Sequence, residues 1–255
     1  YVLTNSRSLT ADAARDLGGV IGANVRAAAQ QTGCEAVLIS RSDSTLRGHF
    51  PAEVDALAHA LGMDAAPRLI VPAFFAGGRY TLDDVHYVAQ GEVLIPAGET
   101  EFARDAAFGY RASNLREWVQ EKSGGAVRAA DVRSISIDDI RKGGPERVLE
   151  MLRALPPASV CVVNAAAERD LDVVALACVL CEAAGQPLLY RSAASFARAR
   201  IGLRTLPLLT REMLFADAPA SAGAGGLVVV GSYVPKSSEQ LARLHASSGT
   251  TGKPT

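Results

Sequence analysis

Residues 159–163 read Ser-Val-Cys-Val-Val (SVCVV), and this short run decides the fold class of the chain. It is apolar after its first position, and a strand buried on both faces is typical of a parallel sheet covered by helices. A helix is predicted next over Leu171–Ala184, then a short strand over Pro187–Tyr190 and a helix over Ala193–Ala199. This alternation predicts an α/β fold with a mainly parallel sheet and helices on both faces.

The same alternation extends towards the amino terminus. Buried strands are predicted at Glu35–Ile39 (EAVLI), Arg68–Val71 (RLIV) and Val132–Ile137, with a hairpin over Tyr80–Leu94. Helices are predicted at Thr10–Gly33, Pro51–Leu61, Arg111–Lys122 and Pro145–Leu155. In the first helix Thr10 is the expected N-cap, Gly33 is the expected end, and the apolar positions are Leu17, Val20, Ile21 and Val25.

The composition is that of a folded globular chain. Hydrophobic residues make up 49% of the 255 residues and charged residues 21%, which excludes a disordered chain. With 26 basic and 27 acidic residues, the net charge of -1 gives no reason to expect nucleic acid or a membrane surface as partner. No run of about 18 uncharged apolar residues predicts a membrane span.

The four cysteines lack the dense spacing of a secreted disulfide scaffold, so we expect a reducing, cytoplasmic setting. Cys178 and Cys181 share one face of a predicted helix, where they pack as small apolar groups. No second Cys or His pair accompanies them, so no metal site is predicted.

Ala218–Gly226 (APASAGAGG) is a small-residue linker that divides the chain. A strand over Leu227–Val230, a turn at Gly231-Ser232 and a helix over Ser237–Leu244 are predicted after it. We therefore expect a first domain over residues 1–217, a linker over 218–226, and the start of a second α/β domain over 227–255. The tail from residue 247 to 255 looks only superficially like a phosphate-binding P-loop, because Pro254 stands where that loop needs Ser or Thr.

Two polar loops follow predicted strands, where parallel α/β sheets bind their ligands. The first, Arg41–His49, contains Ser42, Asp43, Ser44, Arg47 and Gly48 and leads into a helix N-terminus, which favours anions. These groups suit a small, acidic, hydroxyl-rich molecule. Equally, its Ser and Asp side chains could cap the next helix while its arginines are solvated.

The second loop, Pro72–Thr81, places Arg79 directly after Gly77 and Gly78, which let the backbone approach a ligand closely. The alternative is a glycine-rich turn that opens a hairpin. His86 is a further candidate substrate contact, as is His49 in the first loop. A third polar patch, Glu99–Asp105, is interpreted as a helix face or a surface loop.

The strings Asp43–Gly48 (DSTLRG), Pro72–Phe74 with Gly78–Thr81, His86–Val88, and Glu99-Thr100 resemble the N-terminal domain of the four-carbon acid sugar kinase family. Gly226–Leu241 resembles the opening of the family's nucleotide-binding domain. The resemblance covers nearly the whole chain. It implies ATP-dependent phosphorylation of a 3-oxo-tetronate, threonate or erythronate type of acid at a terminal hydroxyl.

The resemblance also implies roles for individual residues. Asp43 and Arg47 are the expected catalytic residues. The expected substrate-binding residues are Ser42, Asp43, Ser44, Arg47, Gly48, Gly78, Arg79 and His86. Gly231 and Ser232 are expected to contact ATP, and Mg²⁺ is implied by ATP chemistry alone. The partners expected are the sugar acid and ATP, and a homodimer is left open.

The acidic Ala-Asp-Asp-x-Thr-Gly loop with which the family begins, and most of its nucleotide-binding domain, are not in this sequence. Ser40-Arg41-Ser42 stands where many relatives have two lysines. We therefore expect a fragment of a kinase. The alternatives are a catalytically inert sugar-acid-binding fragment and an interaction module on the same scaffold.

Overall fold

The computed structural model describes residues 1–204, 206–207, 209–210, 212–213, 228–231 and 235–248. The chain divides into two compact units, Tyr1–Thr205 and Leu206–Thr255, and each is described by itself. The predicted linker Ala218–Gly226 lies outside the described residues.

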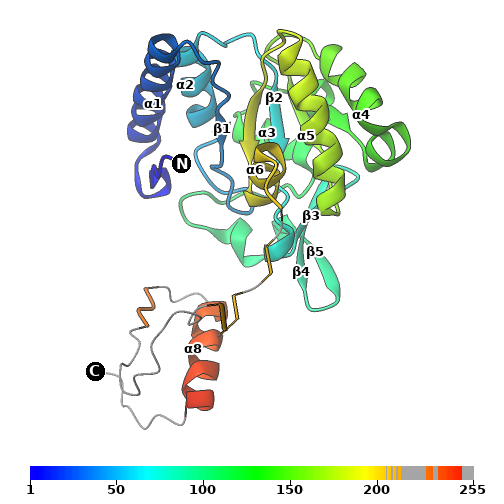
Figure 1. The fold of residues 1–255 in the computed structure, drawn as a ribbon. Coiled ribbons are helices and arrows are strands. Elements are labelled where there is room, and N and C mark those ends of the chain that lie inside the picture. Colours follow the sequence, from blue (N-terminus) through cyan, green and yellow to red (C-terminus); the bar gives the residue numbers. More distant parts are fainter. Residues whose placement is uncertain (205, 208, 211, 214–227, 232–234, 249–255) are drawn as a thin grey trace. The chain divides into compact units, whose positions relative to one another are not determined.

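A five-stranded parallel sheet forms the centre of the first unit (Figure 1). Its strands, in spatial order, are β1 (Ile39–Ser40), β8 (Leu189–Ser192), β2 (Arg68–Val71), β7 (Val160–Val163) and β6 (Arg133–Ile135). Leu69 on β2 is in register with Cys161 on one side and Tyr190 on the other. The predicted α/β class and the mainly parallel sheet are confirmed.

Helices cover both faces of this sheet. The helices of the first unit are α1 (Ala11–Thr32), α2 (Ala52–Leu61), α3 (Leu115–Lys122), α4 (Ile137–Arg153), α5 (Glu168–Ala183) and α6 (Ala194–Ile201). Successive residues of a strand point to opposite faces, so Leu69 packs in the core under α4, α5 and α6 while Ile70 packs in the core under α2 and α3. Figure 1 shows α2 and α4 on opposite sides of the sheet.

The predicted hairpin is a three-stranded antiparallel sheet of β3 (Arg79–Leu82), β4 (Val85–Gln90) and β5 (Val93–Pro96). Asp83 and Asp84 form its first turn with positive φ angles of 49° and 63°. Thr81 exchanges two backbone hydrogen bonds of 3.0 Å with Ala165, just beyond β7. The small sheet is therefore attached to the carboxyl edge of the main sheet.

The predicted strand Glu35–Ile39 is wrong in its extent, because the observed strand β1 covers only Ile39–Ser40. This strand lies at the edge of the sheet and pairs only with β8, so backbone pairing is available on one side alone. Glu35, Ala36 and Val37 are exposed, Val37 at 48%, and Leu38 is half-buried.

The predicted apolar face of α1 is wrong at one position, because Val20 is 57% exposed, whereas Leu17, Ile21 and Val25 are partly buried. The fully buried positions of the helix are Ala14, Gly18 and Gly22. The reason is close packing on α2, since a Cβ atom at Gly22 would lie 2.6 Å from the Cβ of Ala60. The predicted caps are confirmed, because Thr10 accepts a hydrogen bond from the Ala13 amide and Gly33 ends the helix in the left-handed conformation.

Two predicted helix starts are wrong. Helix α3 begins at Leu115 rather than Arg111, after Asn114 accepts hydrogen bonds from the amides of the first turn, and helix α5 begins at Glu168 rather than Leu171. Helix α4 has two segments that are separated at Gly144 (φ 67°). The first begins at Ile137 after a capping box of Ser136 and Asp139, and the second confirms the predicted helix start at Pro145.

In the second unit, helix α8 (Pro235–Ser248) contains the predicted helix Ser237–Leu244. The predicted strand over Leu227–Val230 is not found, since the described residues Val228–Val230 have no regular structure. A strand needs a neighbour for its backbone hydrogen bonds, and the described residues of this unit supply none. Over the described residues of both units, no helix combines the length and apolar character needed to cross a lipid bilayer.

Candidate functional site

The loop Ser42–Gly48 closes on itself in a tight turn at the carboxyl edge of the sheet. The backbone groups of Ser44 and Arg47 exchange hydrogen bonds of 3.2 and 3.3 Å. Between them Thr45 and Leu46 have φ angles of 55° and 65°, a left-handed conformation that costs about 1–2 kcal/mol for each such residue. Leu46 is fully buried, and Tyr110 Oη donates to the Thr45 carbonyl at 2.9 Å. Surrounding contacts therefore hold this loop in a strained shape, which is common at functional sites.

Asp43 lies inside this loop and is buried. Its amide donates to the Ser192 carbonyl at 3.2 Å. Its Oδ1 accepts from the Leu46 amide at 3.1 Å and from Arg191 Nη1 at 2.6 Å. Its Oδ2 is buried and has no hydrogen-bond partner among the described residues. One carboxylate oxygen thus anchors the loop and the other is left for a further donor.

Arg191, the partner of Asp43, was missed by the sequence analysis. Its side chain is 1% exposed, and its guanidinium carbon lies 4.7 Å from the Trp118 ring centroid and 5.4 Å from that of Phe50. It also donates to the Arg47 carbonyl at 3.3 Å. A signal was present, because an arginine directly after the apolar run ending at Tyr190 must find a partner if it is buried.

Gly48 ends the loop because the backbone leaves no room for a side chain. Its φ is 128°, and a Cβ atom there would lie 2.7 Å from the Ser42 carbonyl oxygen. At the other end, Ser42 Oγ accepts from Ser40 Oγ at 2.9 Å. The capping role considered for the Ser and Asp side chains is absent, since Pro51 is the N-cap residue of α2 and no side chain caps it.

Arg47 and Arg79 converge on this loop from the two polar loops found in the sequence. Arg47 donates from Nε to the Ser44 carbonyl at 2.9 Å and pairs with Asp105 Oδ2 at 3.0 Å. Arg79 donates from Nε to Thr45 Oγ1 at 3.1 Å. Both guanidinium groups contact the Phe102 ring, at 5.0 and 4.8 Å from its centroid. The third polar patch, which supplies Phe102 and Asp105, is thus part of the site.

A third guanidinium, that of Arg7, was also missed by the sequence analysis. Arg7 lies in a short 3₁₀ turn over Ser6–Ser8, and its Nη1 donates to Ser44 Oγ at 2.8 Å. Burial, followed by the charge of Arg47, lowers the pKa of Arg7. The same two causes, in the same order, lower the pKa of Arg79. The three guanidinium groups contact neighbouring residues of one loop, because Arg7 and Arg47 donate to Ser44 Oγ and Arg79 donates to Thr45 Oγ1.

His86 is fully buried in β4, and its Nδ1 lies 3.0 Å from Thr81 Oγ1. Its Nε2 has no partner among the described residues. Burial lowers the pKa of His86 to about 4, an effect that the charge of Asp43 opposes and the charge of Arg79 reinforces. The imidazole is therefore neutral at pH 7 and interacts through hydrogen bonds rather than charge.

Gly78 and His49 shape the backbone of the site. Gly78 lies in the left-handed conformation (φ 73°) at the turn before β3. His49 Nε2 lies 3.0 Å from the Ser6 carbonyl oxygen and 3.1 Å from that of Leu9. Two carbonyl acceptors require that this nitrogen carries a hydrogen, so His49 holds the N-terminal segment that positions Arg7.

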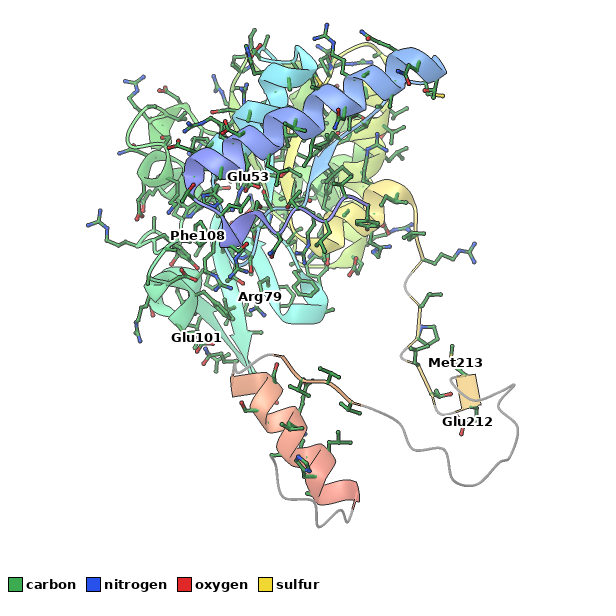
Figure 2. All side chains as sticks on the ribbon, turned by 90° about the vertical axis from the view of Figure 1, so that its left-hand side faces the viewer. Glu53, Arg79, Glu101, Phe108, Glu212 and Met213 are labelled. Atoms are coloured by element: carbon green, nitrogen blue, oxygen red, sulfur yellow. The ribbon has the colours of Figure 1, made fainter. Side chains whose placement is uncertain are left out.

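The charges of the site do not balance. Asp43 is paired with Arg191, and Asp105 with Arg47, while Arg7 and Arg79 form no salt bridge with any described residue. Figure 2 shows Arg79, Glu101 and Phe108 on the same side of the first unit. The arrangement can therefore bind an anion through guanidinium groups and accept a hydrogen bond from a hydroxyl at Asp43 Oδ2.

Of the two residues expected to contact the nucleotide, the structure describes only Gly231. A Cβ atom on Gly231 would meet no atom within 4 Å, and Ser232 lies outside the described residues. No group of three or more His, Cys, Asp or Glu side chains that could hold a metal ion occurs among the residues described.

The fold is thus that of an α/β domain with polar loops at the carboxyl edge of a parallel sheet, a class that binds small ligands there. The sequence model of one protein family, the sugar-binding N-terminal domain, matches residues 1–200 of this chain. The chain belongs to this family, as the N-terminal domain of the four-carbon acid sugar kinases.

Two curated relatives are kinases of four-carbon acids. The D-erythronate kinase of Heliobacterium modesticaldum is 31% identical over 137 residues, which are 53% of this chain and 29% of that protein. The D-threonate kinase of Bordetella bronchiseptica is 41% identical over 105 residues, which are 41% of this chain and 23% of that protein. The chain therefore matches less than a third of the length of either relative.

A solved structure has the same fold over most of this chain. It is a domain of unknown function (DUF1537) from Bordetella bronchiseptica, crystallised as a domain-swapped dimer with bound citrate. It is 27% identical, with a TM-score of 0.59, and the match covers 78% of this chain and 43% of that one.

Proposed function

We propose that this chain binds the acceptor of a kinase that phosphorylates a four-carbon acid sugar at a terminal hydroxyl, with ATP as donor. The observation that carries the proposal is Asp43, whose buried Oδ2 lacks a partner while Arg47 and Arg79 contact the same loop. A hydroxy acid has both complementary groups, a carboxylate for the arginines and a hydroxyl for the aspartate.

In this proposal Arg79 and Arg47 bind the substrate carboxylate. Arg79 has no carboxylate partner among the described residues, so its charge is available for an ionic contact, and Arg47 adds a second guanidinium at the same ring of Phe102. Ser44 and Ser42 provide hydroxyls beside them, and Gly48 and Gly78 shape the backbone at the two loop ends. The site then selects small acids rather than neutral sugars.

Asp43 and Arg47 are the proposed catalytic residues. Asp43 Oδ2 accepts the hydrogen of a substrate hydroxyl and orients its oxygen, and the Arg191 ion pair fixes the carboxylate while it does so. Phosphoryl transfer depends mainly on such positioning and on charge stabilisation. Neutral His86 is proposed to hydrogen-bond a second hydroxyl through Nε2.

ATP with Mg²⁺ would supply the transferred phosphoryl group, and Gly231 and Ser232 are the proposed contacts of this chain to the nucleotide. The names of the two curated kinases support the reaction class, and bound citrate in the solved relative supports a site for an organic acid.

All four cysteines are free thiols, which supports the proposed cytoplasmic setting.

Isothermal titration of the full chain with D-erythronate and D-threonate tests acid binding. We expect saturable binding of one acid, weakened about tenfold or more by Arg79→Met, since a charge-assisted hydrogen bond contributes about 1.5–3 kcal/mol. Lys142→Met is the matched control, because Lys142 pairs with Asp138 on the exposed surface of α4. Failure of both acids to bind, or equal effects of the two variants, would sink the proposal.

A second candidate is an acid-binding fragment without kinase activity, because this chain matches only 29% and 23% of the lengths of the two curated kinases. An ATP-consumption assay with the acid that binds distinguishes the two. Turnover that is lost in Asp43→Asn supports the kinase, and binding without turnover supports the fragment.

A homodimer is proposed as well, because the Bordetella bronchiseptica relative is a domain-swapped dimer. Sedimentation velocity of this chain tests it. A monomer over a range of micromolar concentrations would contradict the dimer.

A further inference from the structure

A second cationic space lies beside the loop Ser42–Gly48, which we call the acid-binding loop, and the proposed function does not use it. It is a cavity of about 410 Å³ in the first unit. The residues that matter in its lining are Arg7, Thr10, Ala11, His49, Phe108 and Lys122. They come from the N-terminal segment, the loop before α2, the loop before α3 and the end of α3, so four chain segments meet there.

Two positive side chains line this cavity without a counter-ion. Neither Arg7 nor Lys122 forms a salt bridge with a described residue. Lys122 Nζ donates to the Gly109 carbonyl at 3.2 Å, and Arg7 donates to the Ser44 hydroxyl, so both have neutral partners only. Arg7 is exposed and Lys122 is half-buried. An anion would give each of them the charged partner that it lacks among the described residues.

Desolvation of both cations agrees with this geometry. Burial lowers the pKa of Lys122, which the charge of Glu121 opposes and that of Arg191 reinforces. Asp105 is the carboxylate that acts on both Lys122 and Arg7. Its Oδ2 pairs with Arg47, and its Oδ1 accepts from the amides of Ala107 and Phe108 at 3.0 and 3.1 Å, so it is already engaged.

Hydrogen bonds hold the backbone around the cavity, and the N-terminus of helix α1 adds positive potential to that of the two cations. His49 holds the carbonyls of Ser6 and Leu9, and its ring meets Phe108 edge-on at 4.8 Å between centroids. Ala11, the first residue of the 22-residue helix α1, lines the cavity, so the positive end of the helix dipole faces it.

We propose that this cavity binds a small oxyanion, a phosphate or a carboxylate group, through Arg7 and Lys122. The lining of this cavity contains neither Arg47 nor Arg79. It adjoins the acid-binding loop, because Arg7 and Arg47 both donate to Ser44 Oγ.

The test is titration of the full chain with inorganic phosphate and, in a second arm, with succinate at constant ionic strength, followed by NMR or calorimetry. We expect saturable binding of at least one anion, weakened about tenfold by Lys122→Met, the loss of one charge-assisted contact. Lys142→Met is again the matched control and leaves affinity unchanged. The arm that saturates identifies phosphate or carboxylate as the preferred group.

Arg7→Met provides a second variant from a different segment, and it is expected to weaken the same anion by a similar factor. Arg79→Met is expected to leave phosphate or succinate affinity unchanged while it reduces acid-sugar binding, which separates this site from the proposed function. The inference is overturned if neither anion saturates, if Lys122→Met and Arg7→Met match Lys142→Met, or if Arg79→Met weakens the anion as much as Lys122→Met.

Discussion

Two ion pairs hold the same loop, and they differ mainly in burial. Arg191 and Asp43 meet at 2.6 Å with side chains 1% and 0% exposed, whereas Arg47 and Asp105 meet at 3.0 Å with side chains 16% and 21% exposed. A third pair on the surface of α1, Arg15 and Asp12, is nearly as short as the first at 2.7 Å. Distance alone therefore does not rank these pairs, and we expect their contributions to stability to follow burial.

The largest expected effect is that of Arg191→Met. The substitution leaves Asp43 as a buried carboxylate with one amide donor, which costs about 3–5 kcal/mol for a broken buried pair. Urea unfolding followed by circular dichroism measures this loss.

The double variant Asp43→Asn with Arg191→Met is its control. Removing both charges is expected to recover part of the stability, because the uncompensated carboxylate is gone. A double variant less stable than either single one would contradict the assigned cause.

The next effect concerns His86, a buried group without an ionic partner. Burial lowers the pKa of His86 to about 4, so the folded state stays neutral while the unfolded state takes up a proton near pH 6.5. The contribution of the neutral, buried His86 to the free energy of unfolding is fully present above pH 6.5. It is lost as the pH falls from 6.5 towards 4, and the loss is about 2 kcal/mol at pH 5. Urea unfolding at pH 7 and pH 5 measures it, and His86→Gln is expected to remove this part of the pH dependence.

A smaller effect is expected for Asp105→Asn. The lost half-buried pair with Arg47 costs about 1 kcal/mol, because water screens this pair more than the buried one. Although partial burial raises the pKa of Asp105, hydrogen bonds from Ala107 and Arg47 outweigh it and lower that pKa. The stabilisation of the folded state by ionised Asp105 is present above the pKa that this group has in the unfolded chain. It is lost as the pH falls through the lowered pKa of the folded state. Unfolding curves at pH 7 and pH 3 test whether the variant lacks this loss.

The smallest effect is expected for Arg15→Ala, which removes the exposed pair with Asp12. Its side chains are 54% and 84% exposed, and such pairs contribute about 0.2–1 kcal/mol. A loss as large as that of Arg191→Met would refute burial as the ranking principle. The same urea unfolding protocol at low and high salt measures it.

The main sheet could be predicted because its strands are decided by local composition. SVCVV and RLIV are buried on both faces, and such runs have few other stable environments. The prediction for the strand at the sheet edge was wrong in its extent, because that extent depends on position in the sheet and not on local composition. An apolar run such as EAVLI predicts burial, and only the position of β1 beside a single neighbour shows that most of it is exposed.

The site was predicted only in part because its key contacts are distant in sequence. The loop Asp43–Gly48 and Arg79 are visible as polar stretches after apolar runs. Arg191 is 148 residues from Asp43, and Arg7 is 37 residues from Ser44, so no local pattern connects either pair. The apolar face of α1 was predicted from large residues, whereas close packing selected Gly18 and Gly22.

The attachment of the small sheet to β7 has a consequence for motion. Thr81 and Ala165 exchange backbone hydrogen bonds, and Asn164 Nδ2 donates to Asp84 Oδ1 at 2.8 Å while Asn164 Oδ1 accepts from the Asp84 amide at 2.8 Å. Arg79 is on the same strand as Thr81. Opening of this strand therefore requires breaking bonds to the central sheet. We expect the Thr81 amide to exchange slowly with solvent, and Arg79 to move little relative to that sheet.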